Sequence, residues 1–157
     1  MVSCCCGAGT FGCPDLGSGY YHGEGVPQEY KEAVRWYRAA AEQGDRDAQF
    51  SLGFMYDEGR GVTQDYKEAV RWFQAAAEQG DASAQNNLGV SYTKGQVVLQ
   101  DNIQAHMWYN LAASSLIGEK GETAVKNRDE MAEKMTSEQI AEAQRLAREW
   151  KPKTGSQ

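Results

Sequence analysis

The sequence predicts an all-α fold in which helix–loop–helix repeats of about 36 residues stack into a solenoid. The first observation behind this prediction is that residues 30–44 return as residues 66–80, with 13 of the 15 positions identical. The second is that the same period continues through aromatic residues at Tyr20, Tyr56, Tyr92, Trp36, Trp72 and Trp108. A fixed period of this length is the signature of a stacked repeat array.

Composition and charge narrow the class of protein. The 157 residues fit one domain, and 41% hydrophobic with 24% charged residues is ordinary for a folded chain. The net charge is −6 and basic residues alternate with acids, so we expect no nucleic-acid partner. No apolar run is long enough to span a membrane, and residues 1–6 lack the pattern of a secretory signal. We therefore expect a cytoplasmic protein as the sequence stands, or a secreted or periplasmic one if the natural N-terminus differs.

Residues 1–13 form a cysteine-rich leader that we expect to be flexible. It holds all four cysteines of the chain, at Cys4, Cys5, Cys6 and Cys13. Three hypotheses stay open for them: reactive thiols without a defined role, a metal clip, or lipidation. Paired Cys-x-x-Cys knuckles are absent and His22 is the one nearby ligand of another kind, so we predict no metal site.

The first repeat, at about residues 14–44, keeps only its second helix, which we place at residues 29–43. In the first helix, proline or glycine stands at Gly12, Pro14 and Gly19, where the next repeat has alanine, phenylalanine and methionine. These residues disfavour a helix within so short a stretch, so we expect this helix to be short or absent.

The second repeat, at about residues 45–80, is the best preserved, and its first helix is expected over residues 46–57. Asp45 is placed to cap this helix, and apolar residues recur every four positions along one face. Gly53 has no side chain and would let a second helix approach closely at its level. Glycines at positions 59 and 61 then end the helix.

The second helix of this repeat is expected over residues 66–79. Asp65, with Glu68 three positions on, is typical of a capping arrangement at a helix start. Trp72 and Phe73 belong to an apolar stripe that would pack on the first helix. Gly80 is placed to end the helix, and Asp81 is placed to cap the next one.

The remaining helices follow the same logic. The third repeat occupies residues 81–117, and its second helix is expected over residues 101–116. After Gly118 the repeat signal stops, and we predict two capping helices within residues 118–152. The first is expected at about residues 122–135. The second follows the capping box Thr136-Ser137-Glu138-Gln139 and reaches Trp150, with a tail at residues 153–157.

The second repeat also carries a longer motif of spaced residues. It reads Ala48-x-x-x-Leu52-Gly53-x-x-Tyr56-x-x-Gly59-x-Gly61-Val62-x-x-Asp65-x-x-x-Ala69-x-x-Trp72-Phe73-x-x-Ala76-Ala77-x-x-Gly80. This motif closely resembles the Sel-one-like repeat, a branch of the tetratricopeptide superfamily, over about residues 16–116. Residues 106–150 resemble the tail of bacterial members.

The resemblance implies a right-handed α-solenoid and a role as an adaptor for protein complexes. Secreted cysteine-rich members of the family join the two helices of a repeat by disulfides. Here Cys13 has no cysteine on a second helix with which to pair. The family also implies that the first helix of each repeat lines a concave, partner-binding surface.

A helical wheel identifies the residues that face away from the hairpin partner, on the expected concave face. They are Asp47, Phe50, Phe54, Asp57, Glu58, Asn86, Val90 and Lys94. Nothing in their own hairpin requires Phe50 and Phe54 to be buried, which leaves two interpretations. Either they pack against the neighbouring first helix, or they form an apolar strip rimmed by acids that binds a hydrophobic and basic segment.

No catalytic constellation follows from the remaining motifs. Residues 7–12 match G-x-G-x-x-G without a preceding strand. His106 stands where the other repeats have valine, which predicts a packed or half-exposed side chain rather than a catalytic one. Residues 91–94 read S-x-x-K and residues 153–155 read K-T-G, but the S-D-N motif that accompanies them in penicillin-recognising enzymes is absent. We predict a non-catalytic, monomeric scaffold for a protein or peptide partner, without a cofactor. The alternatives are a thiol or metal role for the cysteines, or a β-lactamase-like hydrolase by family analogy.

Overall fold

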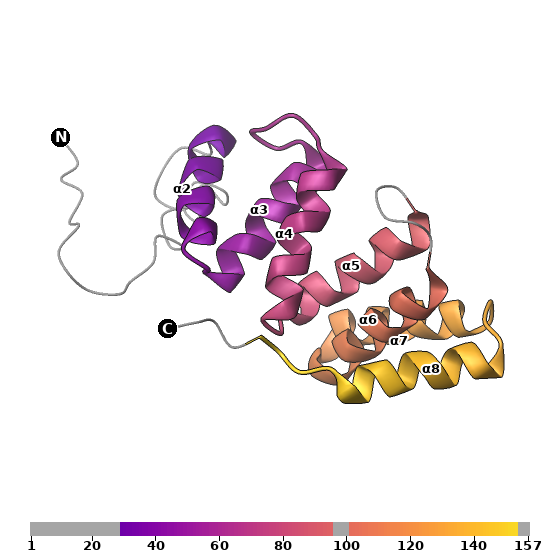
Figure 1. Ribbon diagram of the computed structural model, residues 1–157. Helices are drawn as coiled ribbons and strands as arrows, with labels where there is room; N and C mark the ends of the chain where they lie inside the picture. Colours follow the sequence, from indigo (N-terminus) through magenta and orange to yellow (C-terminus); the bar gives the residue numbers. More distant parts are fainter. Residues whose placement is uncertain (1–28, 96–100, 154–157) are drawn as a thin grey trace, which may run out of the picture.

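The computed structural model describes residues 29–95 and 101–153, which form seven helices and no strand (Figure 1). Their bounds are α2 (Tyr30–Glu42), α3 (Arg46–Glu58), α4 (Tyr66–Glu78), α5 (Ala82–Lys94), α6 (Asn102–Ser115), α7 (Gly118–Ala132) and α8 (Ser137–Glu149). The predicted all-α class is confirmed. The cysteine-rich leader, the first helix of the first repeat and most of the C-terminal tail lie outside the described residues.

Aspartates begin four of these helices because their carboxylates accept hydrogen bonds from the free N–H groups of the first turn. The N–H of Ala48 donates to the Asp45 carboxylate at 2.7 Å, and the N–H of Ala84 donates to the Asp81 carboxylate at the same distance. Asp65 and Asp101 each accept two such bonds. The caps predicted at Asp45, Asp65 and Asp81 are therefore confirmed.

The helices pack in chain order, each first helix between two second helices. Thus α3 packs on α2 and α4, and α5 packs on α4 and α6. Figure 1 shows this succession as a row of crossing helices from α2 to α6. The order is that of a stacked repeat array, in which each unit contacts its neighbours.

In each complete hairpin, an aromatic ring of the second helix packs against a glycine of the first helix. A Cβ atom on Gly53 would lie 2.8 Å from Cδ1 of Phe73, and one on Gly89 would lie 2.7 Å from Cδ1 of Tyr109. Both distances are shorter than van der Waals contact, so only glycine lets the aromatic ring of the second helix rest on the first helix. The close approach predicted at Gly53 is confirmed.

Two apolar clusters form most of the core. One joins α2, α3 and α4 and includes Leu52, Met55 and Trp72. The other joins α4, α5, α6 and α8 around Phe73 and Trp108. Trp72 and Trp108 are each 7% exposed, as expected for core positions of the repeat.

Side-chain hydrogen bonds of glutamines connect successive turns between helices, and we call this arrangement the glutamine ladder. The side-chain amide of Gln49 donates to the carbonyl of Ala41, and Gln79 donates to Oε1 of Gln49 at 2.8 Å and to the carbonyl of Gly44. One repeat later, Gln85 donates to the carbonyl of Ala77 at 3.3 Å. Its buried Oε1, however, has no hydrogen-bond partner within the described ranges.

Helix α7 differs from its prediction at both ends. It begins at Gly118 instead of about Glu122. Ile117 precedes it in extended conformation and forms no side-chain cap, so no capping residue in the sequence marks this start. It ends at Ala132 instead of Met135, because the N–H groups of residues 134 and 135 donate to carbonyls three positions back and form tight turns. Its start continues the repeat period, since α3, α5 and α7 begin 36 residues apart at residues 46, 82 and 118.

Helix α8 follows its prediction closely. The capping box is present, with Thr136 and Gln139 exchanging side-chain and backbone hydrogen bonds. Trp150, directly after α8, meets the ring of Trp108 edge-on at 6.1 Å, and the N–H of Lys153 donates to the carbonyl of Glu78 at 2.7 Å. The end of α8 is thus held to α6 and α4.

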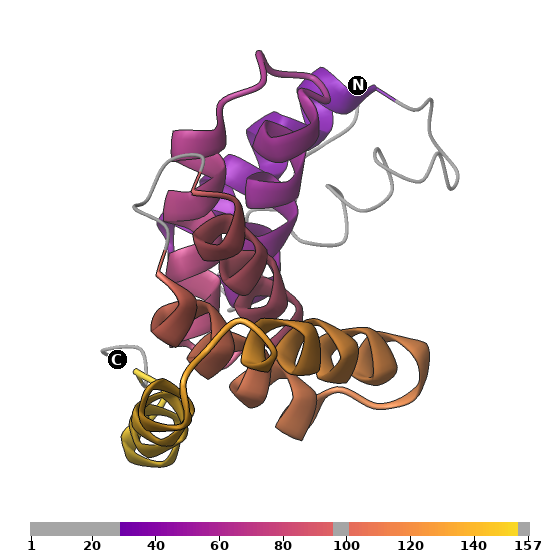
Figure 2. The same cartoon turned by 90° about the vertical axis from the view of Figure 1, so that its right-hand side faces the viewer.

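The last two helices do not close on each other as the earlier pairs do. Both α7 and α8 pack on α6, while α7 and α8 make little contact with each other. Figure 2 shows them apart, with α8 seen nearly end-on and α7 extending to the other side.

Candidate functional site

First helices of three successive units line one groove, which we call the α3–α5–α7 groove. It has a volume of about 260 Å³, and its wall residues are Phe50, Phe54, Ser83, Asn86, Asn87, Leu116, Lys120 and Thr123. The first two come from α3, the next three from α5, and the last three from the α6–α7 turn and α7. Helix starts 36 residues apart bring these three helices to the same side of the array.

Phe50 and Phe54 form the apolar wall of this groove. Both are only partly buried, and both pack against the core cluster around Phe73. The ring of Phe50 lies 5.9 Å from the ring of Phe73, tilted by 40°. The expectation that nothing in their own hairpin would hold these phenylalanines is therefore wrong for Phe50, since Phe73 belongs to the same hairpin. The guanidinium of Arg60 lies 5.6 Å from the ring centre of Phe54.

The acids expected to rim the strip each have a basic neighbour. Arg46 Nε lies 3.1 Å from the Asp47 carboxylate, and Arg60 pairs with Glu58 at 2.5 Å. Burial raises the pKa of the Asp57 carboxyl, the nearby Lys94 ammonium opposes this rise, and Glu58 adds to it. The rim thus carries both signs of charge.

The other predicted residues lie on α5. The side chain of Asn86 accepts a hydrogen bond from Asn127 of α7 at 3.1 Å, which connects two walls of the groove. Val90 is half-buried and packs against the cluster of Ala105, Tyr109 and Met131. Lys94 is exposed in the last turn of α5.

Sequence reasoning missed the residues that α7 and the turn before it contribute. Leu116, Lys120 and Thr123 line the groove, yet no repeat motif marks them. The period itself was the available signal. Extending the helix starts by another 36 residues places a first helix at residue 118, although its side chains no longer match the repeat.

Catalytic chemistry finds no support among the described residues. Within residues 29–95 and 101–153, no group of three His, Cys, Asp or Glu side chains could hold a metal ion. The hydroxyl of Ser91 donates to the carbonyl of Asn87 at 3.0 Å, a bond within its own helix. None of the described helices is both long and apolar enough to cross a membrane.

His106 is a packed side chain, as predicted. It is 2% exposed, and its Nδ1 has no hydrogen-bond partner among the described residues. Burial lowers the pKa of His106, the Arg128 guanidinium lowers it further, and Asp129 opposes them. Burial therefore favours the neutral form of the imidazole.

Comparison with known proteins assigns the family. The Sel1 repeat model matches residues 15–45, 46–81 and 82–115. The chain belongs to the Sel1 repeat family. Sel1 repeat proteins generally act as protein-interaction scaffolds, and the family is typically non-catalytic. No curated protein matches the chain.

Two solved structures are similar to this Sel1 repeat protein. One is a protective antigen present in uropathogenic Escherichia coli strains that displays an SLR fold, with 34% identity and a TM-score of 0.78 over 88% of this chain. The other is a Sel1 repeat protein from Oxalobacter formigenes, with 31% identity and a TM-score of 0.65 over 86% of this chain. The chain spans 29% and 61% of the lengths of these two proteins.

Proposed function

We propose that this Sel1 repeat protein is a non-catalytic scaffold that binds a hydrophobic segment of a partner protein in the α3–α5–α7 groove. The observation that carries the proposal is the pair Phe50 and Phe54, one helical turn apart and partly exposed at the groove wall. Phe73 supports the first ring and Arg60 lies over the second. Partly exposed aromatic rings held in place by their surroundings are typical anchors of protein interfaces.

The size of the groove favours side chains of a peptide over a small molecule. Its volume of about 260 Å³ is below the roughly 300–1,000 Å³ of most small-molecule pockets. The groove wall also includes the polar side chains of Ser83, Asn87 and Thr123. These can hydrogen-bond the backbone of an extended or helical segment while its apolar side chains contact the rings.

Basic residues of the partner would lie at the ends of the groove. Asp47, Asp57 and Glu58 flank the phenylalanines along α3, and each already has a basic neighbour. A partner's lysine or arginine therefore has to compete with Arg46, Arg60 or Lys94. Hydrophobic contact supplies the affinity in this arrangement, and the acids adjust the orientation of the segment.

Affinity purification with mass spectrometry tests this proposal. Thr123→Arg fills the groove from an exposed position on α7, and Thr63→Arg makes the same change in an exposed loop outside it. We expect the first variant to lose partners that wild type and the second variant retain. A Phe50→Asp/Phe54→Asp variant that stays folded by circular dichroism should lose the same partners. Identical partner lists for all four proteins would remove the groove from the function.

A further inference from the structure

A second surface lies on the side of α7 that faces away from the groove. On this side, the face of α7 on which a second helix would pack is uncovered. In the complete hairpins this face of the first helix is covered by the following second helix, at Gly53 and Gly89. The position 36 residues further on is Val125, which is 36% exposed. One turn further along α7, Asp129 is the residue 36 positions after Thr93. In the preceding hairpin, the Thr93 hydroxyl contacts the second helix, 3.1 Å from the Tyr109 hydroxyl.

The cause of this exposure is a change of both residues of the closing pair. Where the earlier hairpins have a glycine beneath an aromatic ring, this unit has Val125 and, at the position along α8 that matches Phe73 in α4 and Tyr109 in α6, the exposed Gln144. The neighbouring Arg145 pairs with Glu142 and Glu149 on α8, each at 2.6 Å. Without the glycine and the ring, α8 packs on α6 and leaves this side of α7 open.

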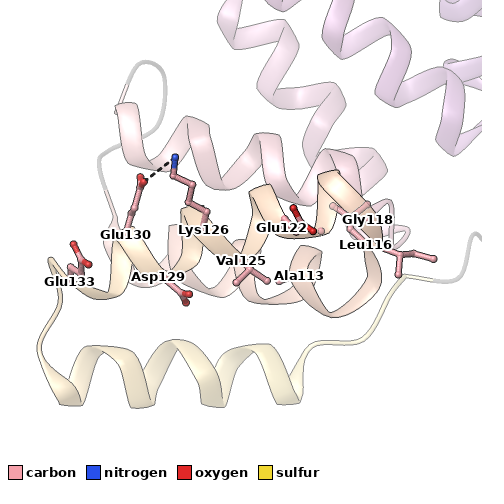
Figure 3. Close-up of a pocket in the computed structure, with 11 residues that line it drawn as sticks. Ala113, Leu116, Gly118, Glu122, Val125, Lys126, Asp129, Glu130 and Glu133 are labelled. Carbon is pink, nitrogen blue, oxygen red and sulfur yellow. Dashed lines mark ion pairs between the residues drawn. The ribbon is translucent and has the colours of Figure 1, made fainter.

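The open α7 face is a broad hollow of about 600 Å³ with an apolar floor. Ala113, Leu116 and Val125 line it together with Ile117, which is 92% exposed. Among the described residues, none from α8 contributes to it. In Figure 3 the labelled residues from Gly118 to Glu133 follow one another along α7.

The rim of this face is acidic. Among the described residues, Glu122, Asp129, Glu130 and Glu133 line it, and Lys126 is the one basic residue beside them. Lys126 lies 3.7 Å from Glu130, the ion pair drawn in Figure 3, and Arg128 pairs with Asp129. Glu122 and Glu133 form no ion pair with another residue of the described ranges.

We propose that the open α7 face binds a basic amphipathic α-helix of a partner protein. The preceding units support a helix as the occupant, since α4 and α6 cover the equivalent faces of α3 and α5. The apolar floor suits the hydrophobic stripe of such a helix, and the carboxylates suit lysine or arginine beside that stripe. Helix α8 of a second copy fits less well, because its polar side carries Glu142 and Glu149 beside its arginines.

The test uses the full chain and a designed 18-residue helical peptide with a leucine stripe flanked by lysines. Controls are a peptide with glutamates in place of the lysines and one with serines in place of the leucines. Binding is followed by fluorescence anisotropy, and amide chemical shifts locate it. We expect only the leucine–lysine peptide to bind and to shift amides of α7 around Val125.

Matched variants separate this face from general acidity and from the groove. Glu122→Lys/Glu133→Lys should weaken the peptide at least tenfold, while Glu29→Lys/Glu42→Lys, with the same change in net charge, should leave affinity within twofold. Phe50→Asp/Phe54→Asp should also leave it unchanged, so failure of the groove proposal is distinguishable from failure of this one. Absence of binding, equal loss in both lysine pairs, loss in the phenylalanine variant, or self-association abolished by Ile117→Asp would each overturn the proposal.

Discussion

The ring of Phe73 occupies the space that a side chain on Gly53 would need. Its Cδ1 and Cε1 atoms would lie 2.8 and 2.9 Å from a Cβ atom at that position, and the carbonyl of Ala69 would lie at 3.2 Å. Tyr109 has the same relation to Gly89. The glycines therefore determine how close the two helices of a hairpin can lie.

Gly53→Ala is expected to destabilise the protein by about 1 kcal/mol or more. Overpacking typically costs about 1–3 kcal/mol, while alanine gains about 1 kcal/mol over glycine in a helix. The ring is held between α3 and α4, so the clash should outweigh the gain. Urea unfolding of variant and wild type measures the difference.

The control is the double variant Gly53→Ala/Phe73→Leu, in which a smaller side chain faces the new methyl group. We expect Gly53→Ala to cost less in the Phe73→Leu background than in wild type. Ser51→Ala, on the same helix, should stay within about 0.5 kcal/mol. A Gly53→Ala protein as stable as wild type would show that the helices move apart without cost.

His106→Val is expected to make the protein less sensitive to acid. Because burial lowers the pKa of His106 below its ordinary value of 6.5, the unfolded chain binds a proton that the folded protein does not. The stability gained from this difference is complete above pH 6.5 and falls as the pH drops toward the lowered pKa. The slope is at most about 1.4 kcal/mol per pH unit.

Unfolding free energies between pH 5 and pH 8 test this expectation. Valine is the residue of the other repeats, where Val34 and Val70 are buried, so the variant should fold. The difference between variant and wild type should move in favour of the variant below pH 6.5 and stay constant above pH 7. Parallel curves over the whole range would contradict the assignment to His106.

Trp150→Ala is expected to loosen α8. Trp150 meets Trp108 edge-on and is partly buried against the core cluster of α4, α5 and α6. Aromatic truncation in a core costs about 3–5 kcal/mol, so about 2 kcal/mol is expected for this half-buried ring. Trp150→Phe should keep most of the contact.

Hydrogen exchange reports where the loss occurs. In Trp150→Ala, amides of α8 should exchange faster than those of α3 and α4, because Trp150 directly follows α8 and anchors it to Trp108 of α6. Uniform acceleration through all seven described helices would instead mean that α8 is part of one cooperative unit with the first repeats.

The fold was readable from the sequence wherever the repeat period and the side-chain chemistry agreed. Asp45, Asp65 and Asp81 predicted helix starts because a carboxylate there satisfies free backbone N–H groups. The start of α7 was missed because Ile117 offers no such signal, and only the spacing of helix starts preserves the period.

The candidate site was less predictable, because it depends on which helices meet in space. A helical wheel places Phe50 and Phe54 on the face that points away from the second helix. A wheel describes one helix alone, so it cannot show that the ring of Phe73 on α4 contacts Phe50. For the same reason, the wheel does not predict that α7 contributes Lys120 and Thr123 to the groove. The open α7 face depends on a contact that α7 and α8 fail to make, and no pattern within a single helix encodes it.

The glutamine ladder does not continue along the whole array. Gln79 ties two successive turns together through Gln49, whereas Ser115 stands at the corresponding position one repeat later and leaves Gln85 Oε1 without a partner among the described residues. In a linear array, partial opening begins where the link between neighbouring units is weakest. The step from α5 to α7 lacks this glutamine bond, and the α3–α5–α7 groove crosses it. A partner segment bound along the groove would therefore hold together the two neighbouring units that the ladder does not tie.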